Sequence, residues 1–224
     1  MCQFNIDGCN GKVLELTGIS AIGKTSYLST LQGSKGHIKV FDAGRFINGK
    51  GNQSKVERLI TEALNMSHLL FNKNVKLSYS DVKWLFSSSF NVRGSVLLKA
   101  NIFLNCLLKF SYYGAINRSD ISGVVCIVDE GISHIPFLLQ DQVNSIKTTQ
   151  EFYFRFKKYL SSLNVICIDG DVNTVERLLL RGHKRLKSSS KNEIKRFDAM
   201  NRSTLKSVLK YSDLYKNFII VLIE

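Results

Sequence analysis

The sequence predicts an α/β domain built around a parallel β-sheet. Short apolar runs rich in β-branched residues alternate along the chain with longer segments that carry apolar residues at helical spacing. Several of these runs end at a glycine or an acidic residue, which is typical of buried parallel strands that lead into a loop. With 224 residues, 44% of them hydrophobic, the chain suits one domain, residues 1–224, with an inserted helical region.

The first half of the chain is expected to hold two strands and several helices. A strand at 12–17 (KVLELT) leads through a glycine-rich turn into a helix at 25–31. A second strand at 38–41 ends at Asp42, and the glycine- and asparagine-rich stretch that follows is expected to be an exposed loop. A helical block comes next, with helices at 54–71, from about Ser80, and at 96–112, the last apolar enough to be mostly buried.

The second half repeats the alternation of strand and helix. The run VVCIV at 124–128 is the strongest strand of the chain, and further strands are expected at 165–168 and 218–223. Helices are expected from a cap at Thr148 and Glu151 to Leu160, at 171–187, and at 192–215. This alternation predicts a parallel sheet with right-handed crossover connections.

Composition narrows the class of protein without fixing it. The formal charge of +13 favours anionic partners: nucleotides, phosphorylated metabolites, nucleic acid or an acidic membrane. Five cysteines, an odd number without metal-ligand spacing, favour a reducing compartment. The N-terminus lacks the pattern of a secretory signal, and the longest apolar run, 96–108, is too short to span a membrane. We therefore expect a cytoplasmic protein with no membrane span.

A phosphate-binding motif follows the first strand. Residues 18–25 read G-x-x-x-x-G-K-T, the Walker A pattern, in the strand-to-helix context that its mechanism requires. Backbone N–H groups of such a loop converge on phosphate oxygens, the lysine bridges the β and γ phosphates, and the threonine hydroxyl ligates Mg²⁺. The nucleotide-binding residues predicted here are Gly18, Ser20, Ala21, Ile22, Gly23, Lys24, Thr25 and Ser26.

Two acidic residues end the third strand, about a hundred residues after this loop. Asp129 is expected to serve the Mg²⁺ shell or to accept the proton of the acceptor, and Glu130 competes for either role. The alternative is that one of the two merely caps the next turn. His134 is a candidate for the acceptor site, or an ordinary loop residue.

A basic helix is the third candidate element. Arg177, Arg181 and Arg185 follow one another at four-residue intervals and share a helix face, while Val175, Leu178 and Leu179 lie mainly on another. Arginine forks suit phosphoryl oxygens, so this row would close over the transferred phosphate. A solvated charged face or a nucleic-acid contact explains the row equally well.

Together these motifs resemble the P-loop nucleotide kinases, and most closely the thymidylate-kinase-like group. The resemblance implies a three-layer P-loop NTPase fold, with a five-stranded parallel sheet in the order 2-3-1-4-5, and an ATP-dependent kinase that uses Mg²⁺. It implies a helical acceptor-side region at about 54–113 and a lid at about 171–191. It also implies that Arg177 and Arg181 belong to the lid and that Asp42 and Arg45 contact the acceptor.

The sequence departs from that family at two motifs. The family carries an Arg-Glu-Pro-Gly-like motif where this chain has Phe-Asp-Ala-Gly-Arg at 41–45, and an Asp-Arg-Tyr-like motif where it has Asp-Glu-Gly at 129–131. Glutamate in place of a phosphate-facing arginine would repel an anionic acceptor, which favours a hydroxyl of a nucleoside or sugar. Against this, Arg45 and Arg93 offer positive charge from other elements.

Three hypotheses of function follow. The first is a kinase for a small acceptor: a nucleotide, a nucleoside, or a sugar hydroxyl such as those phosphorylated in surface-glycan synthesis. The second is an NTPase stimulated by nucleic acid or a protein partner, which the basic composition supports. The third is a module that binds nucleotide without chemistry, against which the intact Gly23, Lys24 and Thr25 argue.

Overall fold

Within the part of the chain that the structure describes, one five-stranded parallel sheet is covered by helices. The structure is a computed structural model that describes residues 13–33, 39–42, 77–116, 124–140, 145–170, 173–181 and 190–223. The strand order is β2-β3-β1-β4-β5, and every neighbouring pair is parallel. This is the order that the sequence resemblance implied. The strands are β1 (Val13–Gly18), β2 (Lys39–Asp42), β3 (Val124–Asp129), β4 (Asn164–Gly170) and β5 (Asn217–Ile223).

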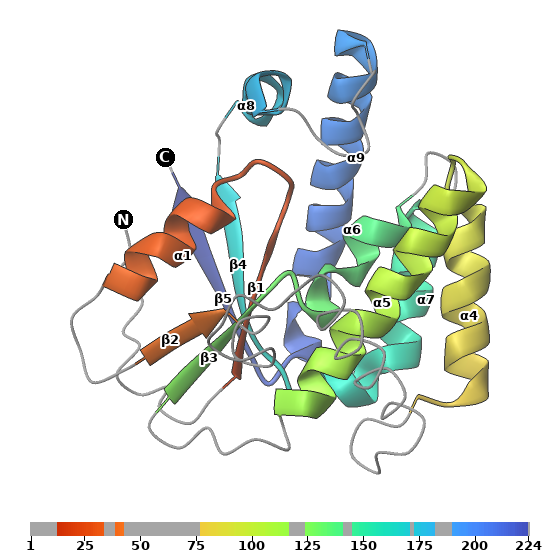
Figure 1. Cartoon of the computed structure of the whole chain (residues 1–224), viewed down its shortest axis with the longest axis horizontal. Helices are drawn as coiled ribbons and strands as arrows, with labels where there is room; N and C mark the ends of the chain where they lie inside the picture. Colours follow the sequence, from red (N-terminus) through yellow and green to blue (C-terminus); the bar gives the residue numbers. More distant parts are fainter. Residues whose placement is uncertain are drawn as a thin grey trace, which may run out of the picture.

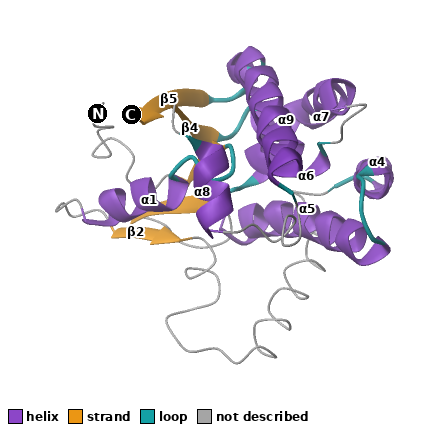
Figure 2. Cartoon of the chain, turned by 90° about the horizontal axis from the view of Figure 1, so that it is seen from above, coloured by secondary structure: helices purple, strands orange, loops and turns teal. Residues whose placement is uncertain are grey.

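Helices connect the strands and cover both faces of the sheet. Figure 2 shows α1 on one side of the sheet and a larger group of helices, α4 to α7 and α9, on the other. Helix α8 lies above the strand ends in Figure 1, close to the turn between β1 and α1. The helices are α1 (Lys24–Gly33), α4 (Tyr79–Asn91), α5 (Val96–Ile116), α6 (Ile135–Leu139), α7 (Ser145–Leu160), α8 (Thr174–Arg181) and α9 (Lys191–Lys210), with short 3₁₀ turns η2 (Ile132–His134) and η3 (Ser212–Leu214).

The register of the sheet brings the predicted motifs to one edge. In the pairing of β1 with β3, Leu16 stands opposite Asp129, and in the pairing of β1 with β4, Gly18 stands opposite Ile168. Parallel strands present their carboxyl ends at the same edge, where ligands bind in open α/β sheets. The glycine-rich turn after β1 and the acidic end of β3 are therefore neighbours.

The central strands are apolar because both of their faces are covered. Val125, Ile127, Val165 and Ile168 are buried, and they belong to one continuous core with apolar residues of α5, α6 and α7. Burial on both faces explains why the strands read as apolar runs without alternation. A charged residue inside such a strand, Glu15 of β1, therefore stands out.

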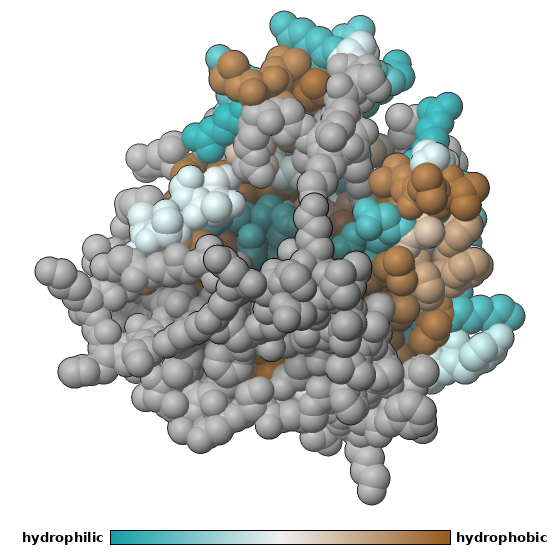
Figure 3. Space-filling model, in the orientation of Figure 1, coloured by the Kyte–Doolittle hydropathy of each residue, from teal (hydrophilic) through white to brown (hydrophobic). Residues whose placement is uncertain are grey.

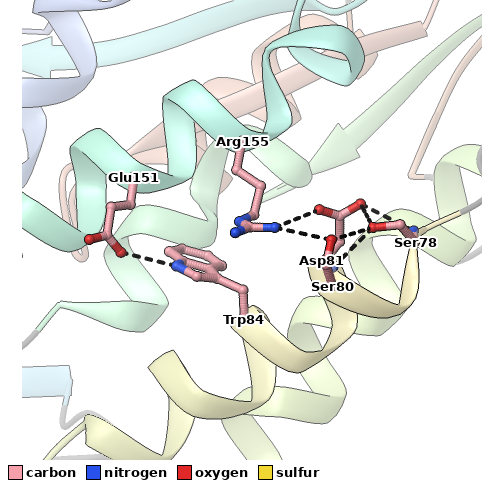
Figure 4. A network of polar contacts seen from close by, with 6 residues as sticks. All are labelled: Ser78, Ser80, Asp81, Trp84, Glu151 and Arg155. Atoms are coloured by element: carbon pink, nitrogen blue, oxygen red, sulfur yellow. Dashed lines mark hydrogen bonds and ion pairs between the residues drawn. The ribbon is translucent and has the colours of Figure 1, made fainter.

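A polar network joins α4 to α7 on the helical side of the sheet (Figure 4). The indole N–H of Trp84 donates to Glu151 Oε2 at 3.1 Å, and Arg155 pairs with Asp81 at 3.3 Å. Ser78 and Asp81 form a capping box, so the same aspartate starts α4 and ties it to α7. The helical block expected from about Ser80 to 112 is thus confirmed for α4 and α5, whereas the helix expected at 54–71 lies outside the described residues.

Several expected boundaries are wrong. Helix α7 begins at Ser145, so Thr148 and Glu151 lie within it and do not cap it. The basic helix begins at Thr174, not 171, because the Asn173 side chain accepts the Glu176 N–H at 3.1 Å and caps it. Helix α9 ends at Lys210 and a 3₁₀ turn follows, and the 3₁₀ turn and helix at 132–139 were not expected.

Helix α5 is less buried than its composition suggests. Val96, Leu97 and Leu104 are exposed, so the expectation of a mostly buried helix is wrong on this face. Figure 3 shows apolar side chains gathered over the α4–α5 corner and again on α8, where Leu179 and Leu180 are exposed. Among the described residues, no helix has both the length and the apolar character needed to cross a membrane.

Candidate functional site

The backbone of the Walker A turn adopts conformations that the motif demands. Gly18 has φ 140° and Gly23 has φ 112°, a region that side chains rarely allow, and Ala21 also has positive φ at 64°. A Cβ on Gly18 would lie 2.5 Å from the carbonyl oxygen of Ile168, so the turn can pass β4 only without a side chain there. The predicted glycines are needed for the shape of the turn.

Lys24 is the first residue of α1 and its side chain folds back over the turn. Its Nζ donates to the carbonyl oxygens of Gly18 at 3.0 Å and Ile19 at 2.9 Å, and lies 3.1 Å from Glu130 Oε1. The lysine is only 7% exposed. The ammonium group of Lys24 is therefore held at the amino end of α1. Both this charge and the helix dipole attract anions there.

Glu130 is the acidic partner that the structure selects. It follows β3 with φ 57°, and its N–H donates to the Leu16 carbonyl at 2.9 Å, which extends the contact between β1 and β3. His134 Nε2 lies 3.5 Å from Glu130 Oε2. The charges of His134, Lys24 and Lys109 hold the pKa of Glu130 well below its usual range, although burial opposes them. The Glu130 carboxylate thus stays ionised beside the Walker A turn.

Two charged residues, Glu15, which is buried, and Lys109, which is half-buried, hold the backbone after Glu130, and sequence reasoning missed both. Glu15 of β1 is 1% exposed and accepts the N–H groups of Ile132 at 2.9 Å and Ser133 at 2.8 Å. The Nζ of Lys109, on α5, donates to the carbonyl oxygen of Glu130. Burial raises the pKa of Glu15 and lowers that of Lys109. The signals were the one charge in the apolar strand at 13–18 and one of the two lysines in the apolar helix at 96–116.

The backbone of residues 130–133 packs closely against Glu15, as its hydrogen bonds to that carboxylate imply. A Cβ on Gly131 would lie 2.3 Å from Cδ of Glu15. Only glycine lets residues 130–133 approach β1 closely enough for the carboxylate to reach two consecutive N–H groups. Glu15, Lys109 and Gly131 therefore set where Glu130 and His134 lie, although none of them needs to touch a ligand.

Arg177 of the basic helix reaches the Walker A turn. Its Nη1 is 3.5 Å from the carbonyl oxygen of Ile22, and it lies 3.6 Å from the position a Cβ on Gly23 would take. Arg181 also lies in α8, but its side chain is not part of what the structure describes. Arg185 lies outside the described residues. Of the arginine row, the structure places Arg177 beside the turn.

Thr25 and Asp129 are the predicted Mg²⁺ ligands. Thr25 is the second residue of α1 and is exposed, and Asp129 ends β3, also exposed. One hydroxyl and one carboxylate from neighbouring elements fit a magnesium ion that keeps waters and phosphate oxygens as its other ligands. No cluster of three or more His, Cys, Asp or Glu able to hold a metal occurs within the described ranges.

The predicted acceptor residues are only partly placed. His134 is buried and stacks on Phe137, with ring centroids 4.8 Å apart, beside Glu130. Asp42 ends β2, next to β3 in the sheet, while Arg45 lies outside the described residues. Arg93 is exposed in the α4–α5 turn, which Figure 1 shows far from the β1–α1 turn. That Arg93 supplies charge at the acceptor stays a prediction.

No protein-family model matches the chain, and neither a curated protein nor a solved structure matches it. The resemblance to P-loop nucleotide kinases therefore stays a prediction from the sequence motifs.

Proposed function

We propose that the chain is an ATP-dependent phosphotransferase of the P-loop kinase type, which moves the γ-phosphoryl group of ATP·Mg²⁺ to a hydroxyl of a small acceptor. One observation carries the proposal: Lys24 lies at the amino end of α1, bonded to two carbonyl oxygens of the turn and 3.1 Å from Glu130. A lysine held in this way is positioned to bind the β and γ phosphates of a nucleotide.

The neighbouring residues support the division of roles. Thr25 and Asp129 would hold Mg²⁺, and Arg177 would meet phosphate oxygens from α8. Because Glu130 has a depressed pKa and pairs with Lys24, it is a weak proton acceptor, so Asp129 is the candidate either for the Mg²⁺ ligand or for the base. Arg181, on the same helix, remains a predicted contact of the phosphates.

The charge at the end of β3 favours a hydroxyl acceptor that is not itself a phosphate. Asp129 and Glu130 both stand where an anionic acceptor would approach, and their repulsion opposes it. A nucleoside or a sugar, such as one phosphorylated in surface-glycan synthesis, fits this charge better than a nucleoside monophosphate. His134, predicted to line the acceptor site, lies beside Glu130 and is buried.

The test is ADP release from ATP·Mg²⁺ in the presence of nucleoside monophosphates, nucleosides, neutral and acidic sugars, or single-stranded nucleic acid, each alone. Lys24→Ala is the inactive control, and Asp129→Asn is compared with Glu130→Gln to assign the base. Release that depends on one class of small acceptor supports the kinase and names its substrate. Release stimulated only by nucleic acid would instead support an NTPase, the alternative that the basic composition supports.

A further inference from the structure

Three side chains from α8 and α9 form a closed ring of polar contacts. The hydroxyl of Thr174 donates to Asp198 Oδ1. Arg202 Nε donates to Asp198 Oδ2 at 3.0 Å, and Arg202 Nη2 donates to the Thr174 hydroxyl at 3.2 Å. Thr174 is fully buried and Asp198 is 8% exposed. Each member of this Thr174–Asp198–Arg202 ring contacts both of the others.

The ring uses the first residue of α8 for a tertiary contact. Polar side chains at the start of a helix commonly cap its free N–H groups. In α8, Asn173 already does so by accepting the N–H of Glu176. The Thr174 hydroxyl is thereby free to reach α9. A buried, ion-paired carboxylate costs desolvation energy, which Asp198 recovers only with both of its partners in place, and one of them, Thr174, lies on α8.

Apolar contacts hold the same helix at its middle. Leu178 of α8 packs with Ile194 and Phe197 of α9 in a small buried cluster, and Ala21 of the Walker A turn packs against that cluster. Polar and apolar contacts together fix the rotation of α8 about its own axis and its position above the Walker A turn. Arg177 lies one turn after Thr174, so the ring determines where its guanidinium lies over Ile22 and Gly23.

We propose that Asp198 is a positioning residue, which docks α8 on α9 so that Arg177 meets the phosphates of a nucleotide in the Walker A turn. Helix α8 is then a docked arm that is ordered before nucleotide arrives. This inference rests on the proposed function, because it takes the turn to bind nucleotide phosphates. It assigns no contact between Asp198 and the ligand.

Electrostatics and positioning predict opposite results for one substitution. Asp198→Asn removes a negative charge close to the phosphate site, which by Coulomb attraction alone would tighten the binding of an anion. The proposal predicts weaker binding, because the amide replaces the ionised partner of Arg202 and loosens α8. The sign of the change therefore separates the two effects.

The experiment measures ATP·Mg²⁺ affinity by calorimetry for Asp198→Asn, Arg177→Gln and the double variant. Thr174→Val, which keeps the shape of the side chain and removes only the hydroxyl, is the second probe of the ring in case Asp198→Asn fails to fold. Glu176→Gln is the matched control, since it removes one negative charge from α8, as Asp198→Asn does from the neighbouring α9, but lies outside the ring. Hydrogen exchange of the α8 amides is followed in the protein without nucleotide.

We expect Asp198→Asn and Thr174→Val to weaken ATP·Mg²⁺ binding about tenfold, the effect of losing one charge-assisted hydrogen bond. In the Arg177→Gln background, Asp198→Asn should change affinity less than about twofold, because the residue through which it acts is gone. Glu176→Gln should leave affinity unchanged or slightly higher. Exchange of the α8 amides should be faster in Asp198→Asn and Thr174→Val but not in Arg177→Gln.

Equal weakening by Asp198→Asn with and without Arg177 would overturn the proposal, as would unchanged or tighter binding in Asp198→Asn. Unchanged exchange in α8 would overturn it as well. Failure of the proposed function looks different: the unsubstituted protein would then bind no ATP·Mg²⁺, or would bind it and transfer nothing to any acceptor. In the second case the affinity measurements still decide the role of Asp198.

Discussion

The ammonium group of Lys24 and the carboxylate of Glu130 lie 3.1 Å apart, and this ion pair joins the Walker A turn to the end of β3. The two residues are more than a hundred positions apart in sequence, yet β1 and β3 are neighbours in the sheet. Glu130 is 39% exposed, while the lysine is buried. The pair can therefore open toward solvent, where a ligand's phosphates would take the place of the carboxylate.

Lys24→Ala should abolish transfer and leave the fold intact. The substitution removes the charge proposed to bind the β and γ phosphates, and loss of such a transition-state contact costs roughly 10²–10³ in turnover. The glutamate left behind is hydrated, so the melting temperature should fall by only a few degrees. ADP release and thermal unfolding by circular dichroism check both statements, and an unreduced turnover would refute the assignment of the turn.

The stability that Glu130 contributes should disappear in acid. Its folded-state pKa is held below the ordinary value of 4.5, chiefly by His134 and then by Lys24 and Lys109, so the contribution is fully present above pH 4.5. It is lost as the pH falls from there toward the folded-state pKa. We expect the gap in unfolding free energy between the unsubstituted protein and Glu130→Gln to shrink between pH 6 and pH 3, as measured by urea unfolding. A gap that widens in acid would contradict the sign of the shift.

The sequence predicts the sheet well because buried strands are apolar runs that alternate with helical segments along the chain. Apolar strands ending in Gly or Asp are visible locally, and the glycines at 18 and 23 are required by positive φ. The roles of Asp129 and Glu130 could not be separated from the sequence, because the two residues are adjacent and both acidic. Where each carboxylate lies depends on the direction in which the chain turns after β3. That turn is set by Glu15 and Lys109, which are 115 and 21 residues away from Glu130.

Helix boundaries were predicted less well, for reasons that are local and physical. The cap expected at Thr148 and Glu151 has the right residue types, but in α7 Glu151 faces Trp84 of α4 instead. Such a contact between segments 67 positions apart leaves no sign in either segment. Likewise, the exposed leucines of α5 and α8 cannot be told from core leucines by composition, since only packing decides which face is covered.

Cys167 should be unreactive in the folded protein. Burial within β4, reinforced by the nearby charge of Asp169, raises the pKa of its thiol to about 12, so almost no thiolate exists at pH 8. We expect iodoacetamide at pH 8 to modify the peptide containing Cys167 only after urea unfolding, as read by mass spectrometry. The thiols of Cys106 and Cys126 are also buried, and they provide internal comparisons. Rapid modification of Cys167 in the native state would show that β4 opens readily.

Gly131→Ala should destabilise the protein through Glu15. The backbone of Gly131 has φ −70° and ψ −150°, so its φ is one that alanine adopts, and the main cost is steric. It comes from the new Cβ, which would lie 2.3 Å from the Glu15 carboxylate carbon. Overpacking of this kind costs about 1–3 kcal/mol. We expect a loss of unfolding free energy in that range from urea unfolding.

A double-mutant cycle separates this clash from a general effect of the substitution. Glu15→Ala is itself costly, because it leaves the N–H groups of Ile132 and Ser133 without their acceptor. In that background, however, Gly131→Ala has room, so the double variant should be more stable than the sum of the single losses by about 0.5–3 kcal/mol. Gly94→Ala is the matched control: its cost comes from φ 142° and from close contact with Leu98, and removing Glu15 should relieve neither. Strict additivity of Gly131→Ala with Glu15→Ala would mean that residues 130–133 are not pressed against β1, and the positioning of Glu130 by Glu15 would have to be abandoned.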